Sequence, residues 1–178
     1  MPSSTTDLWD TITTQAEAES PLWTAALKPR DHQERVQIFS PLGESRYALG
    51  IETIYEGYLL HYGRPRLFAP EDGDTGLLLG DYLYAHGLVR IEEVGTVDAV
   101  NDLAELIALC AYLQAEKIRG DGAVWAATAA WLGRGALEEA RSALRLDNDP
   151  RPLERRAREQ AGDSAVTSAL ATHRGRLG

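Results

Sequence analysis

The sequence has almost no cysteine: Cys110 is the single thiol among 178 residues. One thiol cannot form an internal disulfide, and the apolar residues around it indicate a small core side chain. The start of the chain lacks the basic and apolar regions of a signal peptide. No apolar run approaches the ~20 residues that a membrane-spanning helix needs. These absences favour a cytoplasmic protein without a membrane span.

Signals for β-structure are also missing, since no window shows strict apolar–polar alternation or an Asn-Gly turn. Apolar positions recur at helical spacing instead. The sequence therefore predicts an all-α fold, an orthogonal or antiparallel helical bundle. Hydrophobic residues make up 44% of the chain and charged residues 25%, a composition that supports one packed core.

Basic charge is scarce in most of the chain. The net charge is −9, but from Arg151 onward six arginines face three acidic residues, so this part carries +3 and the preceding part −12. Nucleic-acid binding needs a basic footprint, so we expect no nucleic-acid partner. The shift in charge predicts a helical domain over 1–150 and a short, Arg-rich helical extension over 151–178 that frays at its end.

Capping residues and apolar periodicity place the main helices. An apolar stripe follows Thr5 and runs to Glu19, and Ser20-Pro21 restarts a short helix. A helix ends near Tyr62, and a Pro- and Gly-containing surface loop follows over 63–74. Asp74 then caps a helix to about Val94 that is apolar nearly all round, which predicts a central position. Further helices are expected over 97–117, 123–132 and 136–146.

No complete catalytic or cofactor motif is present. The chain lacks a Gly-x-Ser-x-Gly turn and a phosphate-binding loop, and none of its histidines has an acidic residue three positions before it. Two acidic pairs at helical spacing, Glu52/Glu56 and Asp98/Asp102, could hold a cation but are more typical of a solvated face. We therefore predict no catalytic residue, no metal ligand and no cofactor.

Polar residues inside the apolar segment are the unusual feature. A buried Asp81 needs a partner, either in the packing or at the floor of a cavity. His61 and Tyr84 are further candidates, and several tyrosines could line an apolar cavity or simply pack in the core. The candidate ligand-binding residues are Asp81, Tyr84, His61, Tyr58 and Arg64.

Two segments together resemble a known family. Residues 51–61 end in Leu-Leu-His, a loop with Gly63-Arg64-Pro65 follows, and residues 77–85 read Leu-Leu-Leu-Gly-Asp-Tyr-Leu-Tyr-Ala. This order of helix, loop and helix resembles the trans-isoprenyl (polyprenyl) diphosphate synthases. The resemblance covers 47–117 and implies a terpenoid-synthase-like helical core.

The departures from that family decide what the resemblance implies. Its members carry aspartates after Leu-Leu-His that bind Mg²⁺ and, through it, an allylic diphosphate. Here Tyr62 and Gly63 stand at those positions, and no later Asp-Asp-x-x-Asp motif follows. The resemblance therefore implies a pseudoenzyme, in which the motif around Asp81 serves helix packing.

Three functions remain open from the sequence. The first is a non-catalytic interaction or scaffold protein, a homo-oligomer or a partner of another helical protein, with Leu8, Trp9, Leu22 and Trp23 as its contact surface. The second is a catalytically dead synthase-like protein that binds an isoprenoid or pairs with an active polyprenyl synthase. The third is an enzyme of unrecognised type that uses Asp81 or His61 as acid or base.

Overall fold

The computed structural model describes residues 7–177, and the regular structure within this range is helical. The only pairing of extended backbone there is one isolated bridge between Leu27 and Phe68. The prediction of an all-α fold is confirmed. The α-helices are α1 (Leu8–Glu19), α2 (Pro21–Ala26), α3 (Ala48–Tyr62), α4 (Gly73–Val94), α5 (Val97–Glu116), α6 (Asp121–Trp131), α7 (Glu138–Asp147), α8 (Arg151–Ala161) and α9 (Asp163–Leu177).

Short polar side chains start several of these helices. Asp7 caps α1, Ser20 caps α2 and Thr96 caps α5, each by accepting a backbone N–H of the first turn. For α4 the cap is Asp72 rather than the expected Asp74, because the Asp72 carboxylate accepts both the N–H and the hydroxyl of Thr75. The predicted helix is otherwise correct, and it ends at Val94 as expected.

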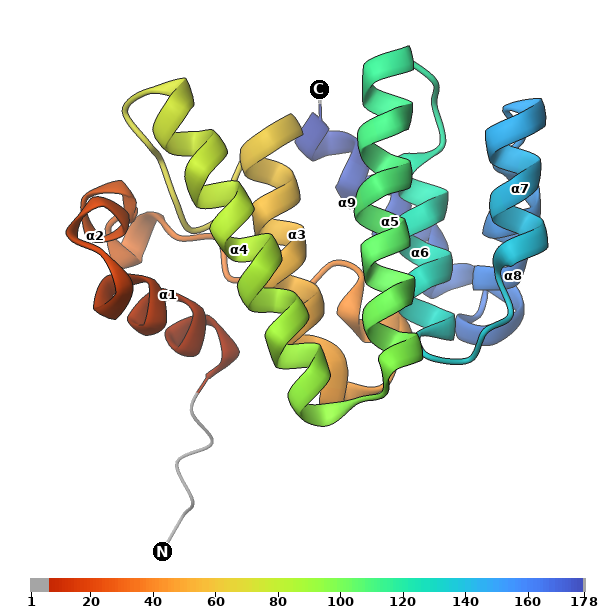
Figure 1. Ribbon diagram of the computed structural model, residues 1–178, viewed down its shortest axis with the longest axis horizontal. Coiled ribbons are helices and arrows are strands. Elements are labelled where there is room, and N and C mark those ends of the chain that lie inside the picture. Colours follow the sequence, from red (N-terminus) through yellow and green to blue (C-terminus); the bar gives the residue numbers. More distant parts are fainter. Residues whose placement is uncertain (1–6, 178) are drawn as a thin grey trace, which may run out of the picture.

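Helices α3 and α4 lie side by side and antiparallel in the middle of the molecule, with α1 and α2 on one side and α5 to α9 on the other (Figure 1). Glycines allow the close approach. A Cβ atom built on Gly57 would lie 2.8 Å from the carbonyl oxygen of Gly80, and one on Gly50 would lie 3.2 Å from that of Gly87. The two backbones therefore touch, and no space for a ligand chain remains along this contact.

This contact predicts a large cost for a single added methyl group. Gly57→Ala is expected to lower the free energy of unfolding by about 1–3 kcal/mol, because overpacking forces the backbones apart. Gly175→Ala in α9 is the matched control, since a Cβ there meets no atom within 4 Å. Alanine should be neutral or stabilise that helix by up to ~1 kcal/mol. Urea denaturation measures the free energy of unfolding of both variants. Equal changes in the two variants would contradict the close contact of α3 and α4.

The most deeply buried helix is α3, and not the helix after Asp74 that the sequence marked as central. Ten consecutive residues of α3, Gly50 to Leu59, are buried, whereas α4 exposes Leu77, Leu78 and Val89 by more than half of their surface. As predicted, the helix after Asp74 packs on several sides, since Leu79 and Leu83 contact the N-terminal cluster and Ile91 the main core, but it also keeps an exposed apolar face. An apolar sequence does not by itself exclude an exposed face.

Two further expectations about exposure are wrong. The connection after α3 is not a plain surface loop, because Arg66, Leu67 and Phe68 are fully buried. Trp9 and Trp23 do not form an exposed contact surface, since both pack with Phe68 in a second core cluster. The N-terminal helices thus cover the 63–72 connection.

The C-terminal helices are part of the main core. Leu153 and Ala157 of α8 and Val166 and Ala169 of α9 are buried in the same cluster as α3, α5 and α6. The predicted fraying of the C-terminal tail is wrong as far as Leu177, where α9 ends. A hydrogen bond helps to hold the end of α9 in place, because the backbone N–H of Arg64 donates to the carbonyl oxygen of Arg176.

Candidate functional site

The structure brings three of the five candidate residues together. His61, near the end of α3, lies 3.1 Å through its Nε2 from the Asp81 carboxylate of α4, and its ring stacks on Tyr84 with centroids 5.1 Å apart. The carboxylate is close but lies outside the direction of a hydrogen bond from Nε2. The Asp81 side chain is 71% exposed, so the expectation that it is buried is wrong.

The other two candidates lie elsewhere. Tyr58 points from α3 towards α6 and α9, where its hydroxyl donates to Asp121. Arg64 lies beyond α3, and its guanidinium donates to the carbonyl oxygen of Gly175 in α9. The five residues therefore do not form one site.

Tyr58 belongs to a buried polar network that links α3, α6 and α9. Asp121 Oδ2 accepts the Tyr58 hydroxyl and lies 2.8 Å from His173 Nε2. His173 Nδ1 lies 2.9 Å from the Tyr55 hydroxyl, and Gln114 of α5 donates to Tyr58. A proton on Nε2 lets His173 donate to Asp121 and accept from Tyr55, so both ring nitrogens have a partner when the imidazole is neutral.

Two local features assemble this network. Asp121 is the first residue of α6, after Gly120, whose φ of 133° suits glycine. Gly122 lets α9 approach, since a Cβ there would lie 3.0 Å from Leu170 and 3.1 Å from His173. Burial alone would raise the pKa of Asp121, but its hydrogen bonds with His173 and Tyr58 outweigh burial and lower that pKa below its ordinary value. Asp121 therefore remains a carboxylate.

The lowered pKa predicts how stability depends on pH. A carboxylate whose pKa is lower in the folded state stabilises the fold above its unfolded pKa, and this contribution is lost as pH falls through the folded pKa. Asp121→Asn should therefore be less stable than wild type at neutral pH, and the difference should shrink below the ordinary pKa of 3.8. Urea denaturation from pH 7 downward measures this, and a constant difference would contradict the role of the charge.

Asp121, His173 and Gln114 were not among the residues that the sequence marked as candidates, whereas Tyr55 belonged to the tyrosines that could line a cavity or pack in the core. A glycine followed by an acidic residue at a helix start was the available signal for Asp121. Nothing local marked His173, because its partners are distant in the sequence and meet it only through the packing of α9.

The acidic pair Glu52/Glu56 is neither a cation site nor a solvated face. Both side chains are fully buried and bind Arg66, Glu52 at 2.5 Å and Glu56 at 3.0 Å. Their remaining oxygens accept backbone N–H groups of Ile38, Ser40 and Leu67. The triad thus fixes the 36–40 and 66–67 segments to α3.

Asp102, from the second acidic pair, is also buried. Its carboxylate binds Arg141 at 3.0 Å and accepts the N–H of Gly133 at 2.8 Å. It therefore secures the turn after α6, and the prediction of a solvated face is wrong for this residue, although Asp98 is exposed.

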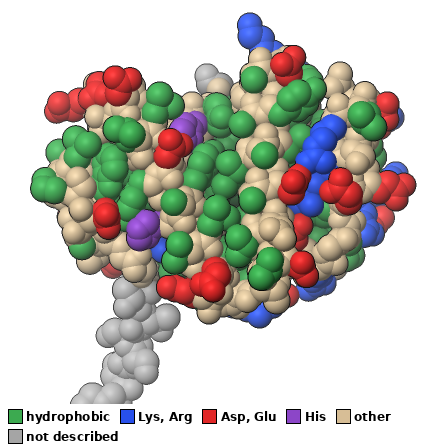
Figure 2. All heavy atoms as spheres, in the orientation of Figure 1, with side chains coloured by type: hydrophobic (Ala, Val, Ile, Leu, Met, Phe, Trp, Pro, Cys, Tyr) green, Lys and Arg blue, Asp and Glu red, His purple; other side chains and the backbone are tan. Residues whose placement is uncertain are grey.

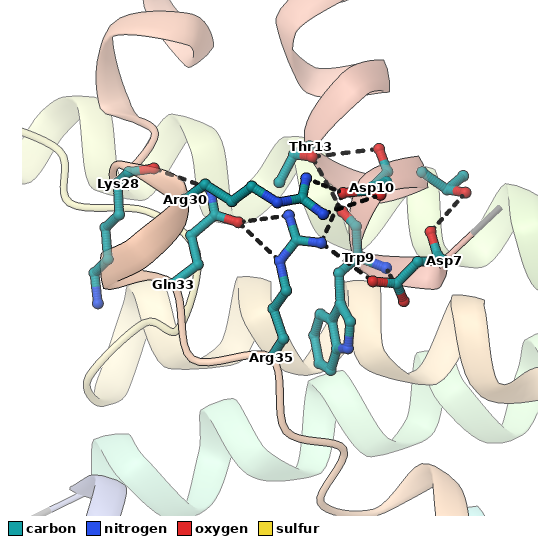
Figure 3. Close-up of polar contacts among 9 residues, drawn as sticks. Asp7, Trp9, Asp10, Thr13, Lys28, Arg30, Gln33 and Arg35 are labelled. Atoms are coloured by element: carbon teal, nitrogen blue, oxygen red, sulfur yellow. Dashed lines mark hydrogen bonds and ion pairs between the residues drawn. The ribbon is translucent and has the colours of Figure 1, made fainter.

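A cluster of charged side chains at the surface, some of them partly buried, joins α1 to the segment after α2 (Figure 3). Arg30 and Arg35 point towards Asp10 at 2.7 and 2.6 Å, and Arg35 also contacts Asp7. Gln33 accepts from Arg35. The charges satisfy one another, so the cluster serves to position α1.

The surface also carries an apolar feature. Figure 2 shows hydrophobic side chains gathered over α4, α5 and the seam between them. We call this the α4–α5 face. It consists of exposed or partly buried residues: Leu77, Leu78, Tyr84, Ala85, Leu88 and Val89 of α4, and Val97, Val100, Ala104, Ile107, Ala108, Ala111, Tyr112 and Ala115 of α5.

Other kinds of site find little support in residues 7–177. No group of three or more His, Cys, Asp or Glu side chains in this range could hold a metal ion. None of the helices described is long and apolar enough to cross a membrane. Comparisons of the chain with protein families, with curated proteins and with solved structures found no match. The α4–α5 face and the Asp121 network therefore remain as the candidate functional features.

Proposed function

We propose that this protein is a non-catalytic helical interaction protein that self-associates through the α4–α5 face. The observation that carries the proposal is the exposure of large apolar side chains on this face, with Val97 76% exposed, Leu78 58% and Val89 53%. An apolar surface shared by two neighbouring helices is typical of a protein–protein contact. Asp81 lies one helical turn from Leu77 and Ala85 and is 71% exposed, so a contact on this part of α4 has to accommodate its carboxylate.

The size of the face suits a second copy. Helices of 22 and 20 residues are about 30 Å long, and two neighbours about 10 Å wide offer on the order of 600 Å². A stable dimer typically buries ~800 Å² on each partner. The proposed dimer therefore needs further contacts around the rim of the face.

The distribution of side-chain sizes also suits a two-fold contact. Ala104, Ala108, Ala111 and Ala115 form an exposed stripe along α5, with Val97 at the start of the helix and Tyr112 one turn after Ala108. Two crossing helices are closest at their crossing point and diverge away from it. The alanines of the stripe therefore allow two α5 helices to approach closely about a two-fold axis.

The resemblance to polyprenyl synthases gives an alternative partner, a related helical chain on the same face. Isoprenoid binding has less support, because Gly57 and Gly80 bring the backbones of α3 and α4 into contact. A ligand chain would have to separate these helices.

Sedimentation equilibrium over a range of concentrations tests the proposal. We expect twice the monomer mass of 19.5 kDa, with dissociation on dilution. A monomer at every concentration would contradict self-association, and co-purification of a different helical chain in a defined complex would favour the alternative partner.

A further inference from the structure

A cavity of about 610 Å³ opens between the start of α6 and helix α9. None of its lining residues belongs to α4 or α5, so it is separate from the α4–α5 face. Its volume lies within the range of small-molecule sites. Its polar lining comes from Arg119, Asp121, Glu154, His173 and Arg174, and its apolar lining from Ala123, Pro150, Leu170 and Leu177.

Among the polar lining residues, Asp121 provides a carboxylate that is held in a fixed position. Tyr58 and His173 both bind Oδ2 of Asp121, and the backbone N–H of Gly122 also binds this carboxylate, so Oδ1 has no side-chain partner among residues 7–177. The side chain retains 16% exposure, and it lines the cavity. Because its supporting residues are buried, the carboxylate is held in place before any ligand arrives.

Two arginines provide the opposite charge. Arg119 and Arg174 are exposed, and within the described chain neither makes an ion pair or a hydrogen bond through its side chain. Glu154 does not neutralise them, because it binds Arg158 at 2.7 Å. The cavity thus presents one anchored acceptor, two unpaired guanidinium groups and an apolar wall.

We propose that this cavity binds a free amino acid with an apolar side chain. The ligand's ammonium group would bind Asp121 Oδ1, and its carboxylate would bind Arg119 and Arg174. Its side chain would pack on Leu170 and Leu177. A simple anion would be repelled by Asp121 and a simple cation by the arginines, whereas a zwitterion satisfies both charges.

A purely structural role for Asp121 makes a different prediction. A carboxylate in the first turn of α6 stabilises the helix through the macrodipole without any ligand. That role requires neither the two unpaired arginines nor the apolar wall.

Isothermal titration calorimetry with L-leucine tests the proposal. L-Leucine should bind wild type at least about ten-fold more tightly than leucinol, which lacks the carboxylate, and 4-methylpentanoate, which lacks the ammonium group. Arg174→Gln changes an exposed residue and should weaken leucine binding by a similar factor. Arg151→Gln is the control, because Arg151 is 85% exposed and lies outside the cavity.

Asp121→Asn should bind L-leucine and 4-methylpentanoate with similar affinity, because it lacks the charge that binds the ammonium group. This comparison requires that the circular dichroism of the variant matches that of wild type. Absence of binding by leucine, valine, methionine and phenylalanine to folded wild type would overturn the proposal. Equal affinity of wild type and Arg174→Gln for leucine would overturn it as well, and this result does not depend on the Asp121 variant folding.

Discussion

Arg66→Met is expected to lower the free energy of unfolding by about 3–5 kcal/mol, a large share of the stability of an ordinary domain. Glu52 and Glu56 are fully buried, and Arg66 is their shared cation. Burial alone would lower the pKa of Arg66, but the two glutamates outweigh burial and raise it, so the guanidinium stays charged. Its removal leaves two carboxylates buried without a counter-charge.

The guanidinium also has contacts that methionine cannot replace. It donates to the carbonyl oxygens of Val36 and Glu52 and lies over the rings of Trp9 and Tyr55. Arg66→Lys keeps the charge but not the planar set of donors, so an intermediate loss is expected.

Urea denaturation measures these changes, with Arg30→Met as the control. Arg30 also binds an acidic residue, Asp10, but its side chain is 71% exposed, and exposed ion pairs contribute little to stability. If Arg66→Met unfolds at the same urea concentration as Arg30→Met, the triad does not stabilise the fold as described.

Ala108→Glu is expected to raise the dissociation constant of the dimer about 100-fold or more, since like charges brought together in an interface cost several kcal/mol. Ala108 lies in the middle of the alanine stripe, so a two-fold contact brings two new carboxylates together. Alanine and glutamate both favour helix, so α5 itself should persist.

The matched control is Leu146→Glu, which adds the same charge at an apolar residue of α7 that is 82% exposed. Sedimentation equilibrium of the two variants separates a local effect from a general effect of net charge. Equal dissociation of both would contradict a contact centred on α5.

The helices could be predicted because their signals are local. Ser20-Pro21 and the end of α4 at Val94 follow from capping and periodicity alone. Burial was less predictable, since it depends on what lies across each helix. Trp9 looked like a contact residue, but it covers Arg66 in a connection far along the chain.

The same limit applies to the candidate sites. The proximity of His61, Asp81 and Tyr84 follows from the pairing of two helices that the sequence itself marked. Asp121 and His173 meet only because α9 folds back across α6, and no spacing rule connects them. The exposed α4–α5 face could not be inferred, because an apolar residue at a surface and one in a core look alike in a sequence.

Cysteine cross-linking tests self-association through α5 most directly. Single cysteines at Ala104, Ala108 and Ala111 should give a covalent dimer under mild oxidation at one or more positions, because small residues at a helix crossing lie within disulfide reach. Cys110 is 1% exposed and should not react, and Leu146→Cys should give no covalent dimer. Dimer formation on the stripe but not at residue 146 is the predicted result. Its absence at all three stripe positions would contradict the account.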